Sequence, residues 1–207
     1  SDSSGIDWQK EINVYRLILG YRNRGHLLAN TNPIRPRKDR QANLDLSYFG
    51  LSDSDLSQTF QAGKFVGLGA TSLKNILTHL KTCYTSSVGA EFKYISSKEK
   101  VSFLIAEMET NFKAPIQLEK KKHILEKLNQ GVIFEKFLHT KYIGQKRFSL
   151  EGGESTIAAL DAIINTAASN DVQEVVIGMA HRGRLNVLVN TLGKMPKDLF
   201  AEFEHKG

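Results

Sequence analysis

One short β-branched run stands out in a chain whose other apolar residues recur at helical spacing. This Val-Val-Ile run at residues 175 to 177, closed by Gly178, predicts a buried strand over residues 174 to 179. A single strand does not make a sheet, so we expect its partners beyond Gly207. A helix is predicted directly after it from apolar residues at i, i+3, i+4 and i+7, namely Leu185, Leu188, Val189 and Leu192.

The fold class that follows is α/β, with a long helical part before it. Residues 1 to 143 carry helical apolar periodicity interrupted by loops, without an alternating strand pattern or an internal repeat. Residues 144 to 207 change to loop, helix, strand, loop, helix and short helix, in which the double glycine at 152 and 153 opens the first helix. We therefore predict a mostly helical amino-terminal region over 1–143 and the start of an α/β domain with an incomplete sheet over 144–207.

Several helices of the first region have specific expected faces and ends. The first, near residues 6 to 22, is predicted to bury the stripe Trp8, Ile12, Tyr15 and Leu19. Thr71 is predicted to cap a second helix, on which His79 lies off the apolar stripe and is expected to be solvated. A later helix with Ile124, Leu125 and Leu128 on its apolar face is expected to end at residues 129 to 131, Asn-Gln-Gly.

The charge pattern favours a protein or small-molecule partner over nucleic acid. The net charge is +6, and the basic residues of the loop at 24–40 are followed by an acidic block. Adjacent blocks of opposite charge pair with each other or with a partner subunit more often than they follow a phosphate backbone. A nucleic-acid-binding module using residues 22 to 40, or an interaction module, stays an alternative. Cys83 is the only cysteine, so no internal disulfide forms and a reducing compartment is expected.

The turn between the predicted strand and helix is the candidate site. His181, Arg182 and Arg184 place cations at a helix start, where the macrodipole disfavours them unless an anion compensates. Arginine offers bidentate donors to carboxylate or phosphate, and histidine transfers protons near neutral pH. The alternative is structural: the arginines would pair with Glu151, Glu154 or another subunit. His123, His139 and His205 show no metal-ligand spacing.

Two long motifs bring a resemblance to a known family. RFSLEGGES at 147–155 and GMAHRGRLNVLVNTLGK at 178–194 resemble the first, decarboxylating component of the 2-oxoglutarate dehydrogenase complex. YRNRGHLLANTNP at 21–33 and VGAEF at 88–92 resemble the amino-terminal helical region of the same enzymes, so the resemblance covers nearly the whole chain. Family members are several times longer, and their Gly-Asp motif with a later Asn, which binds Mg²⁺ and diphosphate, has no counterpart before Gly207. We therefore expect an amino-terminal fragment that is inactive alone.

The resemblance implies a homodimeric enzyme that uses thiamine diphosphate and Mg²⁺ in the citric acid cycle. It would decarboxylate 2-oxoglutarate and pass the succinyl group to the lipoyl domain of a dihydrolipoyl succinyltransferase. His181 matches the family's active-site histidine, Arg182 and Arg184 match anion-orienting positions, and the cofactor and metal ligands are expected outside this chain. The implied location is the bacterial cytoplasm or the mitochondrial matrix, with the cytoplasm preferred, and no membrane contact is expected. Alternatives within the family are a 2-oxoadipate dehydrogenase and a 2-oxoglutarate decarboxylase.

Overall fold

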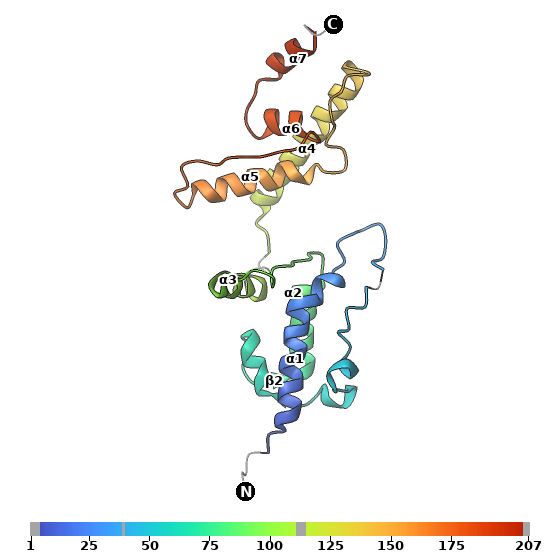
Figure 1. The fold of residues 1–207 in the computed structure, drawn as a ribbon, viewed down its shortest axis with the longest axis vertical. Coiled ribbons are helices and arrows are strands. Elements are labelled where there is room, and N and C mark those ends of the chain that lie inside the picture. The colour runs from blue at the N-terminus through green and yellow to red at the C-terminus, as the bar shows by residue number, and fades with distance from the viewer. Residues whose placement is uncertain (1–4, 39, 111–114, 205–207) are drawn as a thin grey trace. The chain divides into compact units, whose positions relative to one another are not determined.

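The structure is a computed structural model that describes residues 5–38, 40–110 and 115–204. The chain forms two compact units, Ser1–Pro115 and Ile116–Gly207, which Figure 1 traces from blue to green and from yellow to red. This division lies upstream of the composition change near residue 143, and the assignment of domains to 1–143 and 144–207 stays a prediction. Within the described part of the chain, none of the helices is long and apolar enough to cross a membrane.

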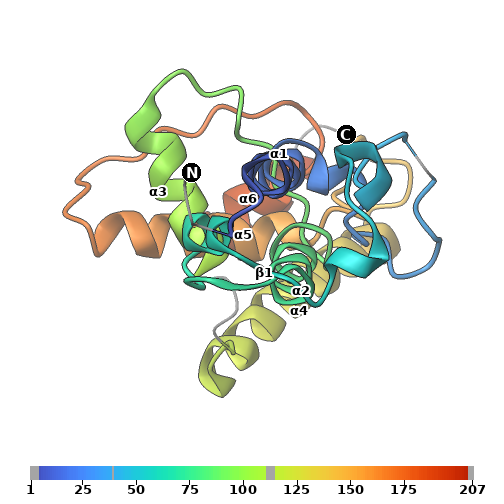
Figure 2. The same ribbon diagram turned by 90° about the horizontal axis from the view of Figure 1, so that it is seen from below.

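The first unit is built on helices, with a small strand pair beside α2. Its α-helices are α1 (Trp8–Arg24), α2 (Leu73–Tyr84) and α3 (Lys98–Glu109). Short 3-10 turns occupy Gly25–Leu27, Leu46–Phe49, Asp53–Asp55 and Gln61–Val66. Strands β1 (Thr59–Phe60) and β2 (Thr71–Ser72) pair antiparallel, with Thr59 opposite Ser72 and Phe60 opposite Thr71. In Figure 2, α1 and α2 are seen nearly end-on beside each other. Both helices contribute buried side chains to the core of this unit, together with residues of the loops and of α3.

Helix α1 forms where the sequence predicts it but buries a different face. Val14, Leu17 and Ile18 are fully buried, whereas Trp8 is 62% exposed and Ile12 is 53% exposed. The predicted stripe Trp8, Ile12, Tyr15 and Leu19 is therefore wrong as the core face. Two apolar stripes coexist on this helix, and the aliphatic one packs more closely against α2 because its branched side chains interdigitate at interior density.

On α2, the capping residue and the burial of His79 both differ from the prediction. Ser72, one residue after the predicted Thr71, caps α2 by accepting a hydrogen bond from the backbone N–H of Asn75 at 3.3 Å. His79 is buried rather than solvated, with its Nε2 atom 3.8 Å from the sulfur of Cys83 one turn later. The face of α2 that enters the core is thus wider than its aliphatic stripe.

The second unit is a group of helices. Those described are α4 (Leu118–Lys141), α5 (Ser155–Ala168), α6 (Arg184–Asn190) and α7 (Pro196–Glu204). The predicted break at residues 129 to 131 is wrong, because α4 continues through Gly131. Gly131 is buried: its carbonyl accepts a hydrogen bond from Asn186, and a Cβ atom there would touch Ile157 at 3.6 Å. Packing against two neighbouring helices therefore outweighs the weak helix propensity of glycine.

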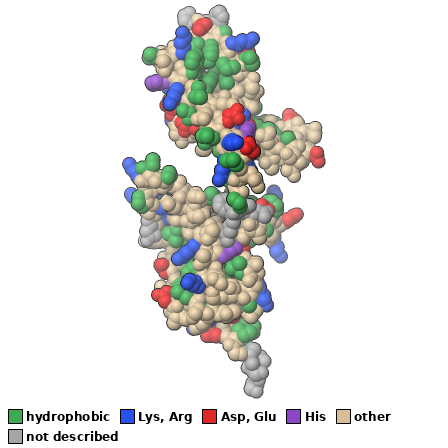
Figure 3. Space-filling view, turned by 180° about the vertical axis from the view of Figure 1, so that it is seen from behind, with side chains coloured by type: hydrophobic (Ala, Val, Ile, Leu, Met, Phe, Trp, Pro, Cys, Tyr) green, Lys and Arg blue, Asp and Glu red, His purple; other side chains and the backbone are tan. Residues whose placement is uncertain are grey.

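The predicted buried strand at 174–179 is wrong for the described structure. The segment is irregular, it pairs with no strand among the described residues, and Val176 is 87% exposed. Strand geometry is stabilised by hydrogen bonds to a neighbour, which the described residues do not supply. Helix α6 at Arg184–Asn190 confirms the helix predicted after it. Figure 3 shows hydrophobic side chains at the surface of the second unit. Ile133, Phe137 and Val175 are among the exposed hydrophobic residues of this unit.

Candidate functional site

The loop that carries His181 is bound to the Arg147–Ser155 motif by backbone hydrogen bonds. Gly183, at the start of α6, donates its backbone N–H to the carbonyl of Phe148 at 2.7 Å. The backbone N–H of Arg184 turns back to the carbonyl of His181 at 3.1 Å. The two motifs that carry the family resemblance therefore lie side by side, although residues 148 and 183 are far apart in the sequence.

Glycine is required at position 183 for two separate reasons. Its φ angle is +79°, in the left-handed region that favours glycine. A Cβ atom there would also lie 2.4 Å from the Cδ1 atom of Leu150, whose side chain is buried. The close approach lets Phe148 and Gly183 share a hydrogen bond across the two segments.

The imidazole of His181 rests on an aromatic ring. The ring centroids of His181 and Phe148 are 5.1 Å apart and the planes are inclined by 27°, which is a stacked arrangement. Phe148 has a φ angle of +47°, an uncommon backbone conformation for a bulky residue. His181 is exposed, and within the described residues no hydrogen bond engages its ring nitrogens. Stacking thus orients the ring while its nitrogens stay available to a ligand.

The two arginines of the loop differ in their contacts. Arg182 donates from Nη2 to the carbonyl of Glu151 at 3.3 Å and is otherwise exposed. Arg184 begins α6, and its guanidinium contacts no acidic group among residues 5–38, 40–110 and 115–204. Among the described residues, neither arginine forms an ion pair with Glu151 or Glu154. The predicted alternative, in which these glutamates pair with the arginines, is therefore wrong.

The carboxylates near the loop have other partners. Glu151 accepts a hydrogen bond from the Ser149 hydroxyl at 3.0 Å and lies 3.6 Å from Arg147. The hydrogen bond from the Ser149 hydroxyl lowers the pKa of Glu151; burial opposes this, and the charge of Arg147 adds to the lowering. Glu154 accepts from the backbone N–H of Gly152 at 3.0 Å. The loop therefore leaves the charge of both arginines available to an anion.

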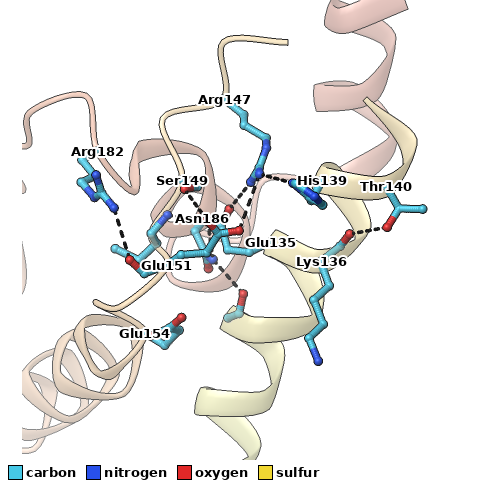
Figure 4. Close-up of polar contacts among 12 residues, drawn as sticks. Glu135, Lys136, His139, Thr140, Arg147, Ser149, Glu151, Glu154, Arg182 and Asn186 are labelled. Atoms are coloured by element: carbon cyan, nitrogen blue, oxygen red, sulfur yellow. Dashed lines mark hydrogen bonds and ion pairs between the residues drawn. The ribbon is translucent and has the colours of Figure 1, made fainter. Parts of the chain in front are cut away.

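Sequence reasoning missed a buried polar cluster beneath these motifs, shown in Figure 4. We name it the Glu135 cluster: the carboxylate of Glu135, the guanidinium of Arg147, the backbone N–H of Leu150 and the side-chain amide of Asn186. Arg147 and Asn186 belong to the two recognised motifs. In the sequence, the feature that could have pointed to Glu135 is an acidic residue on the same helix face as the apolar residues Phe134 and Leu138, which are buried.

The described residues do not make up a metal site by themselves. No three His, Cys, Asp or Glu side chains are grouped to hold an ion in the described ranges. His123 instead hydrogen-bonds Asp161 at 2.7 Å, and the Nδ1 atom of His139 lies 2.9 Å from Arg147. His205 lies outside the described residues.

The fold and the loop define a helical protein segment that presents a histidine and two arginines on one exposed loop. The chain is 50% identical over 202 residues to the 2-oxoglutarate dehydrogenase E1 component of Cupriavidus necator, covering 96% of this chain and 21% of that protein. It is 42% identical over 201 residues to the protein of the same name in Azotobacter vinelandii, with 96% and 21% covered. The 2-oxoglutarate dehydrogenase E1/E2 component of Corynebacterium glutamicum is 44% identical over 208 residues, with 98% and 17% covered.

These matches confirm the resemblance. The chain is homologous to a segment of the 2-oxoglutarate dehydrogenase E1 components, and it spans about a fifth of the length of the curated relatives it matches. No protein-family profile matches the chain.

Proposed function

We propose that this chain forms one wall of the active site of a thiamine-diphosphate- and Mg²⁺-dependent 2-oxoglutarate dehydrogenase. The full-length homodimer would decarboxylate 2-oxoglutarate and transfer the succinyl group to the lipoyl domain of a dihydrolipoyl succinyltransferase. The observation that carries the proposal is the contact between the two recognised motifs, which places His181 on Phe148 with its ring nitrogens available to a ligand. The names of the relatives support 2-oxoglutarate over 2-oxoadipate as the substrate.

In this proposal His181 donates a hydrogen bond to the carboxylate or the developing oxyanion of the bound 2-oxo acid. A donor held in place before reaction stabilises developing charge without reorganising at that moment. Stacking on Phe148 supplies that fixed orientation. Arg182, anchored through the Glu151 carbonyl, and Arg184 orient the same anion by charge and by their planar donors. The groups that bind cofactor and metal are expected outside this chain.

Replacing His181 by alanine in the full-length protein tests this role. Loss of one preorganised donor is expected to lower kcat for 2-oxoglutarate by about 10²–10³-fold. The affinity for thiamine diphosphate, measured by calorimetric titration, is expected to stay nearly unchanged. His123→Ala is the matched control, since this half-exposed histidine pairs with Asp161 on α5 away from the motifs. Unchanged turnover in His181→Ala would remove His181 from the site.

The substrate and the cofactor are tested on the same protein. We expect kcat/KM to be higher with 2-oxoglutarate than with 2-oxoadipate, and the reverse order would assign the enzyme to the other substrate. Removal of Mg²⁺ by a chelator and of thiamine diphosphate by gel filtration is expected to abolish turnover, with recovery on adding both back. Activity that survives this treatment would contradict the proposed cofactors.

A further inference from the structure

We propose that Glu135 is a positioning residue: its buried carboxylate joins the two recognised motifs and thereby sets the place of His181. The inference rests on the proposed function, because it concerns the geometry of the same loop. Glu135 lies on α4, far before His181 in the sequence, so no local periodicity connects them.

The carboxylate of Glu135 uses both oxygens. Its Oε1 atom accepts from the backbone N–H of Leu150 and from the side-chain amide of Asn186, each at 3.0 Å. Its Oε2 atom accepts from Nη1 of Arg147, also at 3.0 Å. Only 4% of the Glu135 side chain is exposed, and Asn186 is fully buried. One carboxylate therefore bonds a side chain from each motif and a backbone amide of the first motif (Figure 4).

Leu150 connects this carboxylate to the His181 loop. Two residues before it, Phe148 accepts the Gly183 N–H and stacks on His181. One residue after it, the carbonyl of Glu151 accepts from Arg182. Because Glu135 holds the backbone between these two contacts, a displacement of Leu150 moves both.

Asn186 connects the carboxylate to the start of α6. Its side-chain amide also donates to the carbonyl of Gly131 on α4 at 3.0 Å, and its oxygen accepts from Asn190 at 2.7 Å. Asn186 lies three residues after Gly183, so these bonds hold the first turn of α6 against α4. The loop that carries His181 is thus fixed at both of its edges by groups that meet at Glu135.

A carboxylate suits this position better than an apolar side chain. A leucine would leave the Leu150 N–H and one Asn186 donor without an acceptor in a buried place. Glutamine would keep one carbonyl oxygen but turn its NH₂ group toward the guanidinium of Arg147, so that two donors would face each other. The charge of Glu135 is compensated by Arg147, which itself bonds His139. A paired buried charge of this kind is consistent with a role in conformational specificity.

The test compares Glu135→Gln with the unsubstituted protein, both at full length. Hydrogen–deuterium exchange of peptides covering residues 178–190 reports the loop, and peptides of α5 over 155–168 are the internal reference. We expect Glu135→Gln to speed hydrogen exchange of residues 178–190 about tenfold and to leave exchange in α5 unchanged. We also expect it to lower kcat for 2-oxoglutarate by about 10- to 100-fold, since misplacement of a reacting group by about 1 Å lowers the rate by up to about that much.

Glu119→Gln is the matched control on the same helix. Its side chain is 82% exposed and pairs only with Lys122 at 2.9 Å among the described residues, so neither readout should change. Arg147→Lys, which keeps the charge but loses the planar fork, is the milder second variant if Glu135→Gln fails to fold. It is expected to raise loop exchange with a smaller fall in kcat.

The outcomes separate this inference from the proposed function. Unchanged exchange at 178–190 in both Glu135→Gln and Arg147→Lys overturns the positioning role, whatever happens to turnover. Faster exchange with unchanged turnover overturns it as well, because the loop position would then not matter to the reaction. Faster exchange with reduced turnover supports it. The proposed function fails separately if His181→Ala leaves turnover unchanged while Glu135→Gln still loosens the loop.

Discussion

Removing the buried carboxylate of Glu109 is expected to destabilise the first unit strongly. Glu109 ends α3 and accepts from Arg22 of α1 through two bonds, at 2.7 and 2.8 Å. It also accepts from the hydroxyl of Tyr84, at the end of α2, at 2.6 Å. Arg22 is 9% exposed and Glu109 is 7% exposed. This carboxylate therefore joins three helices at one buried point.

The structure sets the size of the effect. In Glu109→Ala the guanidinium of Arg22 loses both bonds to the carboxylate and keeps the bond from Nη2 to the Phe65 carbonyl, at 2.7 Å. An unpaired buried charge costs about 3–5 kcal/mol, and the stranded Tyr84 hydroxyl adds to it. Domains of this size unfold with about 5–15 kcal/mol, so the loss is a large fraction of the whole. Replacing both Arg22 and Glu109 by methionine is expected to recover most of it, since apolar pairs substitute well for buried ion pairs.

Urea unfolding of the chain measures this difference. Trp8 is the only tryptophan and lies on α1, so its fluorescence reports on the first unit, and circular dichroism follows both units. Glu119→Ala is the control, because its partner Lys122 is 63% exposed and such surface pairs contribute about 1 kcal/mol or less. A loss below about 1 kcal/mol in Glu109→Ala would refute the reasoning that this buried pair stabilises the helix contacts.

Two further predictions concern a glycine and a carboxylate. Gly183→Ala is expected to lower the unfolding free energy of the second unit by about 1–3 kcal/mol, because left-handed backbone strain adds to the clash with Leu150. Gly152→Ala is the control, since Gly152 has a φ of +86° but no atom within 4 Å of a Cβ built there. An equal loss in both would show that the clash contributes nothing. The hydrogen bond from Lys10, opposed by burial, lowers the pKa of Asp55 from its ordinary 3.8. Ionised Asp55 therefore stabilises the fold above pH 3.8. The difference in unfolding free energy between the unsubstituted protein and Asp55→Asn, measured by urea titration, should shrink as the pH falls below about 4. A difference that does not change with pH would contradict this.

The first unit illustrates what periodicity determines and what it leaves open. The spacing in α1 placed a helix within two residues of its observed start at Trp8. It did not select the buried face, because both Trp8–Ile12–Tyr15 and Val14–Leu17–Ile18 recur at helical spacing. The choice between them depends on which stripe fits against α2, and α2 is distant in the sequence.

In the candidate site, too, the sequence predicted some residues and left others to the tertiary structure. His181, Arg182 and Arg184 were chosen from their charge at a helix start and from the motif that contains them. Phe148 beneath His181 and Glu135 beneath Leu150 were not, because stacking and a buried ion pair join segments with no fixed sequence separation. The predicted strand at 174–179 rested on β propensity, which is context-dependent and is outweighed where no partner strand is present.

The sequence by itself determined the approximate positions of most helices, the candidate loop and the family resemblance, since these depend on local propensity, spacing and motif. Only the tertiary structure decided which helix faces are buried, that α4 continues through Gly131, and that the loop bearing His181 lies on Phe148 and is connected to Glu135. Those features arise from close packing and from pairing of buried polar groups, which act between residues that are distant along the chain.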